Sequence, residues 1–192
     1  MQQELRVEKE LAQKYLETAG VLMLVLDKKG FVRMANAEAA RVLECSKEEI
    51  EGKHWFSEFI SPNDRKALDS LFKKHISDNF SSGHHYKNTI ITAKGNTRTI
   101  QWNNVYLENQ FGEHAAVLSS GLDITKSELA QKKIAENERK FSSIFNYSGI
   151  AIALGDPDGN ILQTNTVFRN MTAYSEKELS QLHFSQLTHP DD

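Results

Sequence analysis

The strongest constraint on this chain is a repeat within its own sequence. Residues 20–54 align with residues 149–183 at a constant offset of 129 positions. The identical pairs are mainly residues that form turns and helix caps: Gly20 with Gly149, Asp27 with Asp156, Gly30 with Gly159, Asn36 with Asn165, Ser46 with Ser175, Glu49 with Glu178 and His54 with His183. Because a repeat of this length marks a structural unit that occurs twice, we expect two copies of one domain.

The same offset extends upstream into a segment with helical spacing. Apolar residues seven and four positions apart recur in both copies, as in a helix with one apolar face: Leu5 with Ile134, Ala12 with Phe141 and Leu16 with Phe145. Each copy is therefore predicted to be a helix followed by a domain. The predicted division is an amphipathic helix at 1–18, a complete domain at 19–125, a linker helix at 126–146 and the N-terminal part of a second domain at 147–192.

The first domain is predicted to contain five strands, with helices between the second and the third. The strands are expected at 21–26, 31–35, 85–93, 97–107 and 114–122, and helices are expected at 37–43, after a cap at Ser46, and at 62–76. Residues 27–30 are expected to form the first hairpin turn, with Gly30 at the position that requires a positive φ. This order of elements predicts an α+β fold, a five-stranded antiparallel sheet with short helices on one face.

The second copy ends at Asp192, where its long helix should begin. It keeps two strands and the short helices, but it lacks three strands of the sheet. Half a sheet cannot bury its apolar face, so this segment is expected to be poorly stable by itself. The expectation is that the sequence is a fragment of a longer protein.

Composition narrows the class of protein. The 23 basic residues against 26 acidic ones give a net charge of −3, which indicates no nucleic-acid partner. The single cysteine excludes a disulfide framework and is typical of a reducing compartment. The longest apolar run, 21–26, is too short to span a bilayer. These observations predict a cytoplasmic globular protein with no direct membrane contact.

Short motifs in a fixed order resemble the PAS family of sensory domains. In the first copy they are Asp27-x-x-Gly30, Asn36-Ala37, "SPND" at 61–64 and "LDIT" at 122–125. In the second copy they are "GDPDGNILQTN" at 155–165, "YSEKEL" at 174–179 and "HPDD" at 189–192. The resemblance implies a sensory module of a multidomain signalling protein, followed by a truncated second module.

The resemblance also gives a meaning to the junction at 122–125, where a strand meets a charged helix without glycine. In PAS proteins this element couples the sheet to a signalling helix, which implies a transmission role for Asp123, Ile124 and Thr125. A tight joint passes a displacement that a flexible loop would absorb. Thr125 is predicted to cap the helix, with Glu128 completing a capping box. The alternative is that Asp123 and Thr125 only terminate the strand.

PAS folds often hold a small molecule between sheet and helices. The residues expected to surround such a pocket, or simply to form the core, are Trp55, Phe59, Phe72, His75 and Trp102. Some PAS relatives bind haem through a histidine on the long helix, so haem on His75 is an open alternative to a packed histidine. Cys45 lies outside the motif that flavin-binding relatives carry. We predict no metal, no haem and no covalently bound cofactor.

The function predicted from these features is binding and transmission, without catalysis. The sequence has no glycine-rich phosphate loop, no HExxH and no GxSxG motif. An effector, such as a histidine kinase or a diguanylate cyclase, would lie outside this chain. The spacing of Leu5, Ala12 and Leu16 predicts a weak homodimer through the N-terminal and linker helices. Two alternatives remain, a purely structural dimerisation module and a haem-binding sensor.

Overall fold

The computed structural model describes residues 11, 14–77, 84–108, 110 and 114–188, which divide between two compact units, residues 1–128 and 129–192. The elements of the first unit are β1 (Leu22–Asp27), β2 (Val32–Ala35), α2 (Ala37–Leu43), α3 (Lys47–Ile50), α4 (Trp55–Glu58), α5 (Pro62–Ser77), β3 (His84–Ile91), β4 (Thr97–Glu108) and β5 (His114–Asp123). The helix α6 (Thr125–Tyr147) follows. The second unit then contains β6 (Ala153–Gly155), β7 (Ile161–Thr164), α7 (Thr166–Thr172), α8 (Glu176–Leu179) and the 3-10 turn η1 (Phe184–Gln186).

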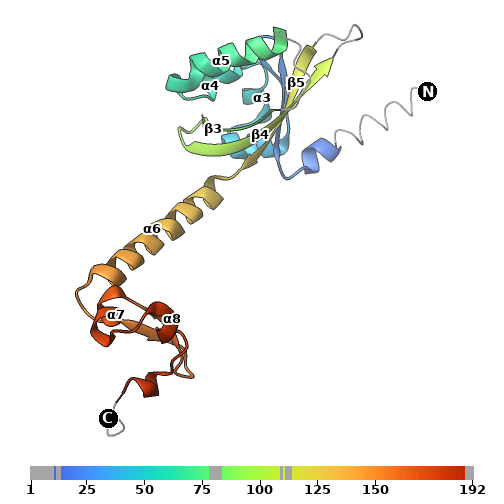
Figure 1. Cartoon of the computed structure of the whole chain (residues 1–192). Helices are drawn as coiled ribbons and strands as arrows, with labels where there is room; N and C mark the ends of the chain where they lie inside the picture. The colour runs from blue at the N-terminus through green and yellow to red at the C-terminus, as the bar shows by residue number, and fades with distance from the viewer. Residues whose placement is uncertain (1–10, 12–13, 78–83, 109, 111–113, 189–192) are drawn as a thin grey trace. The chain divides into compact units, whose positions relative to one another are not determined.

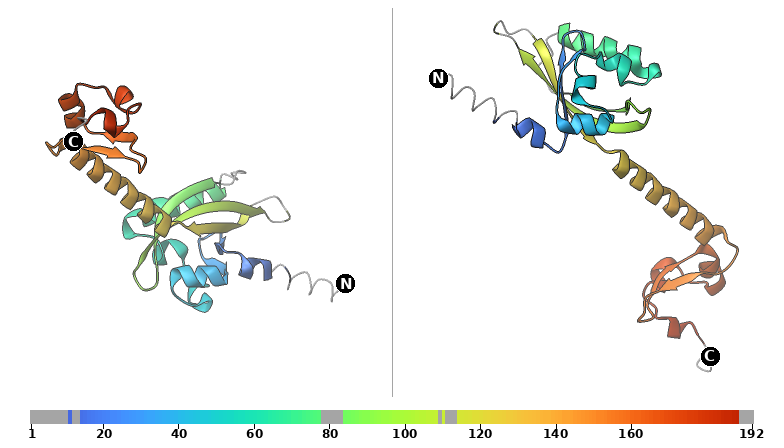
Figure 2. Two further views of the ribbon diagram at one scale, coloured as in Figure 1. Left: turned by 90° about the horizontal axis from the view of Figure 1, so that it is seen from below. Right: turned by 180° about the vertical axis from the view of Figure 1, so that it is seen from behind.

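The five strands of the first unit form one antiparallel sheet in the order β2-β1-β5-β4-β3. The helices α2 to α5, inserted between β2 and β3, lie together on one side of this sheet (Figures 1 and 2). The predicted α+β fold with a PAS-like sheet is confirmed. The first and last strands pair at the centre, because the hairpins β1–β2 and β3–β4 extend the sheet outward on either side of them.

The core lies between this sheet and the helices. Alternate residues of β1, namely Leu22, Leu24 and Leu26, are buried against side chains from the helices, as the period of two along a strand requires. The helical part of the core is Ala39, Val42, Leu43, Ile50, Trp55 and Phe56. At the first hairpin Gly30 has a φ of 83°, as predicted for the turn that joins β1 to β2.

Local capping signals determine where the short helices begin. Ser46 accepts a hydrogen bond from the backbone of Glu49, whose carboxylate accepts one from the backbone of Ser46, so the predicted capping box is present. Strand and helix ends otherwise lie within about two residues of the predicted ones, as expected for frayed termini. In the N-terminal helix, residues 14–18 are helical. Leu5 and Ala12 of the predicted apolar seam lie outside the described residues.

The second unit repeats the beginning of the first. Strands β6 and β7 form a two-stranded sheet, and Phe145, Ile161 and Leu179 are buried beside it. Large apolar side chains remain on the surface, including Leu162 at 66% and Met171 at 67% exposure. This exposure fits a sheet that lacks strands, and the low stability expected for this segment stays a prediction.

Candidate functional site: a cavity beside β4 and the joint to α6

A cavity of about 330 Å³ lies between α5 and the outer strands of the sheet. Helices α4 and α5 contribute most of its apolar side: Phe56, Leu68, Leu71, Phe72 and His75. Strands β3 and β4 contribute its more polar side: Tyr86, Lys87, Asn88, Asn104 and Tyr106. The volume is at the lower end of the range of about 300–1,000 Å³ found for small-molecule sites.

The arrangement follows from two periodicities. Along β4, alternate residues face the helices, so Trp102, Asn104 and Tyr106 lie on one side of the sheet. Along α5, residues three and four positions apart share a face, which brings Leu68 and Phe72 over the same surface. The inner face of β4, which becomes polar at Asn104 and Tyr106, therefore lies opposite the apolar face of α5.

The structure distributes the predicted pocket residues between this cavity and the core. Phe72 and His75 line the cavity. Trp55 and Trp102 line a narrow adjoining space of about 10 Å³, and their rings meet edge to face with centroids 5.6 Å apart. Phe59 is buried beside Trp55, at a centroid distance of 5.1 Å.

Sequence reasoning missed the polar wall of the cavity, Tyr86, Asn104 and Tyr106. A signal for it was present, because once Trp102 is placed inside, a period of two along the strand also places 104 and 106 inside. On β3, Asn88 accepts a hydrogen bond from the Trp102 indole at 2.7 Å. This bond fixes the indole at the inner end of the wall.

The side chains of Tyr86 and Tyr106 are partly withdrawn from solvent, with Tyr86 still 37% exposed. Desolvation raises the pKa of Tyr86, an effect partly offset by a hydrogen bond with the Asn104 side chain. Desolvation also raises the pKa of Tyr106, and the neighbouring Tyr86 adds to the increase. Both hydroxyls are therefore protonated at neutral pH and able to donate hydrogen bonds.

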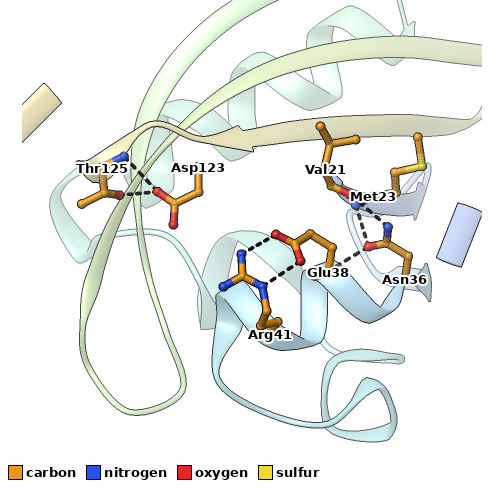
Figure 3. A network of polar contacts seen from close by, with 8 residues as sticks. Val21, Met23, Asn36, Glu38, Arg41, Asp123 and Thr125 are labelled. Atoms are coloured by element: carbon orange, nitrogen blue, oxygen red, sulfur yellow. Dashed lines mark hydrogen bonds and ion pairs between the residues drawn. The ribbon is translucent and has the colours of Figure 1, made fainter. Parts of the chain in front are cut away.

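The predicted joint, Asp123-Ile124-Thr125, is bound to β4 along its whole length: Asp123 pairs with Ile100 in the sheet, and the next two residues contact Thr99. The carbonyl of Thr99 accepts from the backbone of Ile124 at 3.0 Å, and its N–H donates to the Thr125 hydroxyl at 2.8 Å. The Asp123 carboxylate accepts from both the backbone and the hydroxyl of Thr125 (Figure 3). Strand end, helix start and β4 thus form one hydrogen-bonded corner without a loop.

The capping box predicted at this corner is wrong. Helix α6 begins at Thr125, so this residue occupies the first helical position and the backbone of Glu128 donates to Ile124. The Thr125 hydroxyl is instead engaged by Thr99 and Asp123. The tertiary partner from β4 outweighs the local cap, because both compete for the same oxygen.

A second contact joins α6 to the sheet. The Lys87 ammonium on β3 lies 2.5 Å from the Glu128 carboxylate in the first turn of α6. Lys87 stands between Tyr86 and Asn88, both of which line the cavity with it. The start of α6 is therefore bound to both strands that form the cavity wall.

Where the N-terminal helix enters the first unit, Asn36 holds it in place. The buried Asn36 side chain donates to the carbonyls of Leu16 and Val21, each at 2.9 Å, and accepts from the backbones of Met23 and Ala39. Figure 3 shows its contacts with Val21 and Met23. Asn36 therefore ties the helix end, β1 and α2 together at one point. From the sequence alone, Asn36 was predicted only to be a turn or helix-cap residue.

Helix α2 also approaches the joint. Glu38 and Arg41 form a two-bond ion pair on its surface, and the hydrogen bond from Arg41 lowers the pKa of Glu38 (Figure 3). The Glu38 pair raises the pKa of Arg41, and Asp123 makes the smallest contribution at both residues, opposing the lowered pKa of Glu38 and adding to the raised pKa of Arg41. Charges on α2 and at the joint therefore influence one another.

Other chemistry has little support in the described part of the chain. No group of three or more His, Cys, Asp or Glu residues there is arranged to hold a metal ion. Burial, with a smaller effect from Glu49, raises the pKa of the Cys45 thiol, which packs against the core and is therefore unsuited to nucleophilic chemistry.

The composition of the helices shows whether any of them could span a membrane. Among the described residues, no helix combines the length and the apolar character that crossing a bilayer requires.

Comparison with solved structures shows that this architecture is the PAS fold. A PAS domain from Colwellia psychrerythraea matches with a TM-score of 0.55 and 19% identity, covering 62% of this chain and 98% of that one. The PAS domain of an HTR-like protein from Haloarcula marismortui gives a TM-score of 0.52 and 14% identity, covering 64% and 97%. At these identities the likeness shows the fold.

The sequence defines the family more narrowly. A diguanylate cyclase-like sensor domain matches residues 15–119, more than half of the chain, and the chain belongs to this family. A PAS domain matches residues 148–192, so the predicted resemblance to PAS domains is confirmed. The chain is a sensory module of a signalling protein.

Two curated signalling proteins share parts of this sequence. The sensor histidine kinase TmoS of Ectopseudomonas mendocina is 34% identical over 79 residues, 40% of this chain and 8% of that protein. The probable diguanylate cyclase DgcE of Escherichia coli K12 is 42% identical over 62 residues, 32% of this chain and 6% of that protein. The matches span less than a tenth of the length of either relative.

Proposed function

We propose that the chain senses a small molecule in the cavity beside α5 and transmits its binding through Asp123, Ile124 and Thr125 to α6. The observation that carries the proposal is that one strand, β4, serves both places. Its residues Asn104 and Tyr106 line the cavity, while Thr99 binds the joint through both backbone groups. A ligand that displaces β4 would displace the start of α6, because no flexible loop separates them.

Signal transmission requires that the ligand has different affinities for two arrangements of the sheet. A ligand shifts the joint only if it binds one arrangement of β3 and β4 better than another. The Lys87–Glu128 ion pair, side chains 55% and 23% exposed, contributes little to stability but holds α6 to β3 in one of these arrangements. Ligand binding would thus select a position of α6 at small energetic cost.

Dimerisation is the second part of the proposal. Helix α6 exposes Ile134, Phe141 and Ile144, whose spacings of seven and three residues place them on one face. We infer that this face, with the N-terminal helix, forms a weak homodimer. Sedimentation should show a concentration-dependent dimer that weakens in Ile134→Glu/Ile144→Glu. A strict monomer at high concentration would contradict it.

The third part of the proposal concerns the longer protein that contains this chain. We propose a cytoplasmic, multidomain protein, with its division at 1–18, 19–125, 126–146 and 147–192 as predicted from the sequence. The relatives named above are a histidine kinase and a probable diguanylate cyclase. An effector of one of these two kinds, outside this chain, would read the position of α6.

Hydrogen exchange tests the coupling between cavity and joint. Any compound that raises the melting temperature in a metabolite screen should change the exchange rates of the Thr99 and Thr125 amides. In Asp123→Ala the same compound should still bind, but the exchange at these two amides should no longer respond to it. Ligand binding that leaves both amides unchanged in the unmodified chain would contradict transmission through this joint, and the absence of any stabilising compound would favour the purely structural module.

A further inference from the structure

The cavity contains a buried hydrogen-bond acceptor without a protein partner. The Asn104 side chain is only 8% exposed, and within the described residues its Oδ1 has no hydrogen-bond partner. Because the carbonyl oxygen is unpaired, the hydrogen bond between this side chain and the Tyr86 hydroxyl uses the amide nitrogen as donor. Asn104 lines the cavity, and its oxygen is covered in this arrangement, so a ligand reaches this acceptor by displacing a neighbouring side chain.

An unpaired buried carbonyl is costly, so natural proteins leave few of them. A bound molecule that donates a hydrogen bond would remove this cost. One water molecule occupies about 30 Å³ in the liquid, so a single water would fill only a small part of the cavity of about 330 Å³. A larger molecule with a donor at one end satisfies the acceptor and fills the remaining space.

The surroundings of Asn104 define the charge and shape of that molecule. Phe56, Leu71 and Phe72 offer an apolar surface to its body. The Tyr86 hydroxyl can donate to its oxygen, since the raised pKa of Tyr86 keeps it protonated. An anionic head would face the Asn104 acceptor without a proton to donate, which leaves this buried acceptor unpaired.

The lysine beside the cavity does not favour an anion. Lys87 belongs to the lining, but its ammonium is paired with Glu128 at 2.5 Å. An anion would have to draw Lys87 from this pair. His75 is the other basic residue of the lining.

We propose that the cavity binds an uncharged alcohol, phenol or primary amide with a short aromatic or aliphatic body, its donor directed to Asn104 Oδ1. This inference rests on the proposed sensing function and names its ligand class. A hydroxyl head suits the wall best, because it donates to Asn104 and accepts from a tyrosine at the same time.

Three matched probes test the requirement for a donor: 2-phenylethanol, its methyl ether and phenylacetate. The ether keeps the oxygen and loses the donor, while phenylacetate carries a charge and has no donor. Titration of the 192-residue chain, followed by ligand-detected NMR, should show 2-phenylethanol binding at least tenfold more tightly than either of the others.

Two variants assign the preference to the cavity acceptor. Asn104→Leu keeps a similar volume and removes the acceptor, so it should bind alcohol and ether within about twofold of each other. Asn103→Leu is the matched control, since Asn103 is the exposed neighbour on the opposite face of β4. This control should keep the full preference for the alcohol.

The outcomes separate this inference from the proposed function. Equal binding of alcohol and ether to the unmodified chain, tighter binding of phenylacetate, or no binding of any probe would overturn the ligand class. Alcohol binding that depends on Asn104 but leaves the Thr99 and Thr125 amides unchanged would support the ligand class and contradict signal transmission.

Discussion

Asn36 and Asn165 make the same four hydrogen bonds in the two units, every partner shifted by 129 positions. Asn36 donates to the carbonyls of Leu16 and Val21 and accepts from the backbones of Met23 and Ala39; Asn165 donates to those of Phe145 and Ile150 and accepts from Ile152 and Phe168. In both units the asparagine binds the last turns of the incoming helix to the first strand. In the second unit the incoming helix is α6.

The substitution Asn36→Asp tests this attachment. The carboxylate keeps an acceptor for Met23 and Ala39 but loses both donations and faces two carbonyls. We expect the free energy of unfolding of the first unit to fall by about 2–5 kcal/mol. Urea unfolding measures it, with the exposed Asn103→Asp as a control expected within about 0.5 kcal/mol of the unmodified chain. Similar losses in both variants would show that the buried bonds are not responsible.

Gly121 on β5 has a role that its sequence context does not reveal. A Cβ placed there would lie 2.6 Å from Ile100 and 2.8 Å from the Trp102 ring. Gly121→Ala should therefore displace the indole and lower stability by about 1–3 kcal/mol, the usual cost of overpacking. Gly20→Ala is the matched control, since nothing lies within 4 Å of its added Cβ. A melting temperature of Gly121→Ala equal to that of the control would refute the close contact.

Glu44 gives the first unit a definite pH dependence. Hydrogen bonds from Thr92 and Asn96, together with Arg98, lower the pKa of Glu44 from 4.5 to about 2. Because the folded pKa lies below the unfolded one, this stabilisation is complete above pH 4.5 and is lost as the pH falls through 2. Glu44→Gln should thus be less stable at pH 7, with a difference that narrows toward pH 3. A difference that stays constant across urea titrations at pH 7, 4 and 3 would contradict this linkage.

The cofactor prediction has a spectroscopic test. Because His75 is a single potential ligand on α5, we expect the purified chain to show no Soret band, and added haemin to keep the Soret position that it has in buffer alone. A Soret band that disappears in His75→Ala, while the Phe72→Leu control retains it, would establish a haem sensor in place of the small-molecule sensor.

Much of the fold was predictable because short-range chemistry determines it. Gly30 acts within its own turn, and Ser46 and Glu49 are only three residues apart. Because the sequence repeats at an offset of 129 positions, each of these local motifs occurs twice and is easier to recognise. The strand-to-helix junction was visible because no glycine separates β5 from α6.

The parts that were missed depend on contacts distant in sequence. The hydrogen bond from Thr99 to Thr125 spans 26 residues, and the ion pair of Lys87 with Glu128 spans 41 residues. No local sequence pattern therefore predicts either contact. The pocket prediction relied on large aromatic residues. Trp55 and Phe72 are equally apolar in sequence, and only packing places Phe72 at the wide cavity and Trp55 behind it.

The joint itself provides the most direct test of transmission. Asp123→Ala removes the acceptor that orders Thr125, at a cost of about 0.5–2 kcal/mol, since the core lies elsewhere. Inserting Gly-Gly between Thr125 and Lys126 loosens the same joint without touching the carboxylate. Both changes should leave the fold intact and abolish the dependence of output on stimulus in the protein that carries this chain, because α6 would no longer hold one position for each state of the sheet.

The control for these two variants is Lys94→Gly in the exposed β3–β4 turn, which adds flexibility without lengthening the turn that holds Thr92 and Asn96 against Glu44, and which should keep normal regulation. The measurements are output with and without stimulus and thermal melting of the chain. Since the two joint variants act by different routes, a shared loss of regulation with near-normal melting would identify the joint as the element that transmits. Normal regulation in both would reduce Asp123, Ile124 and Thr125 to a connection, and the transmission route would then have to run through another contact, with the Lys87–Glu128 pair as the first to examine.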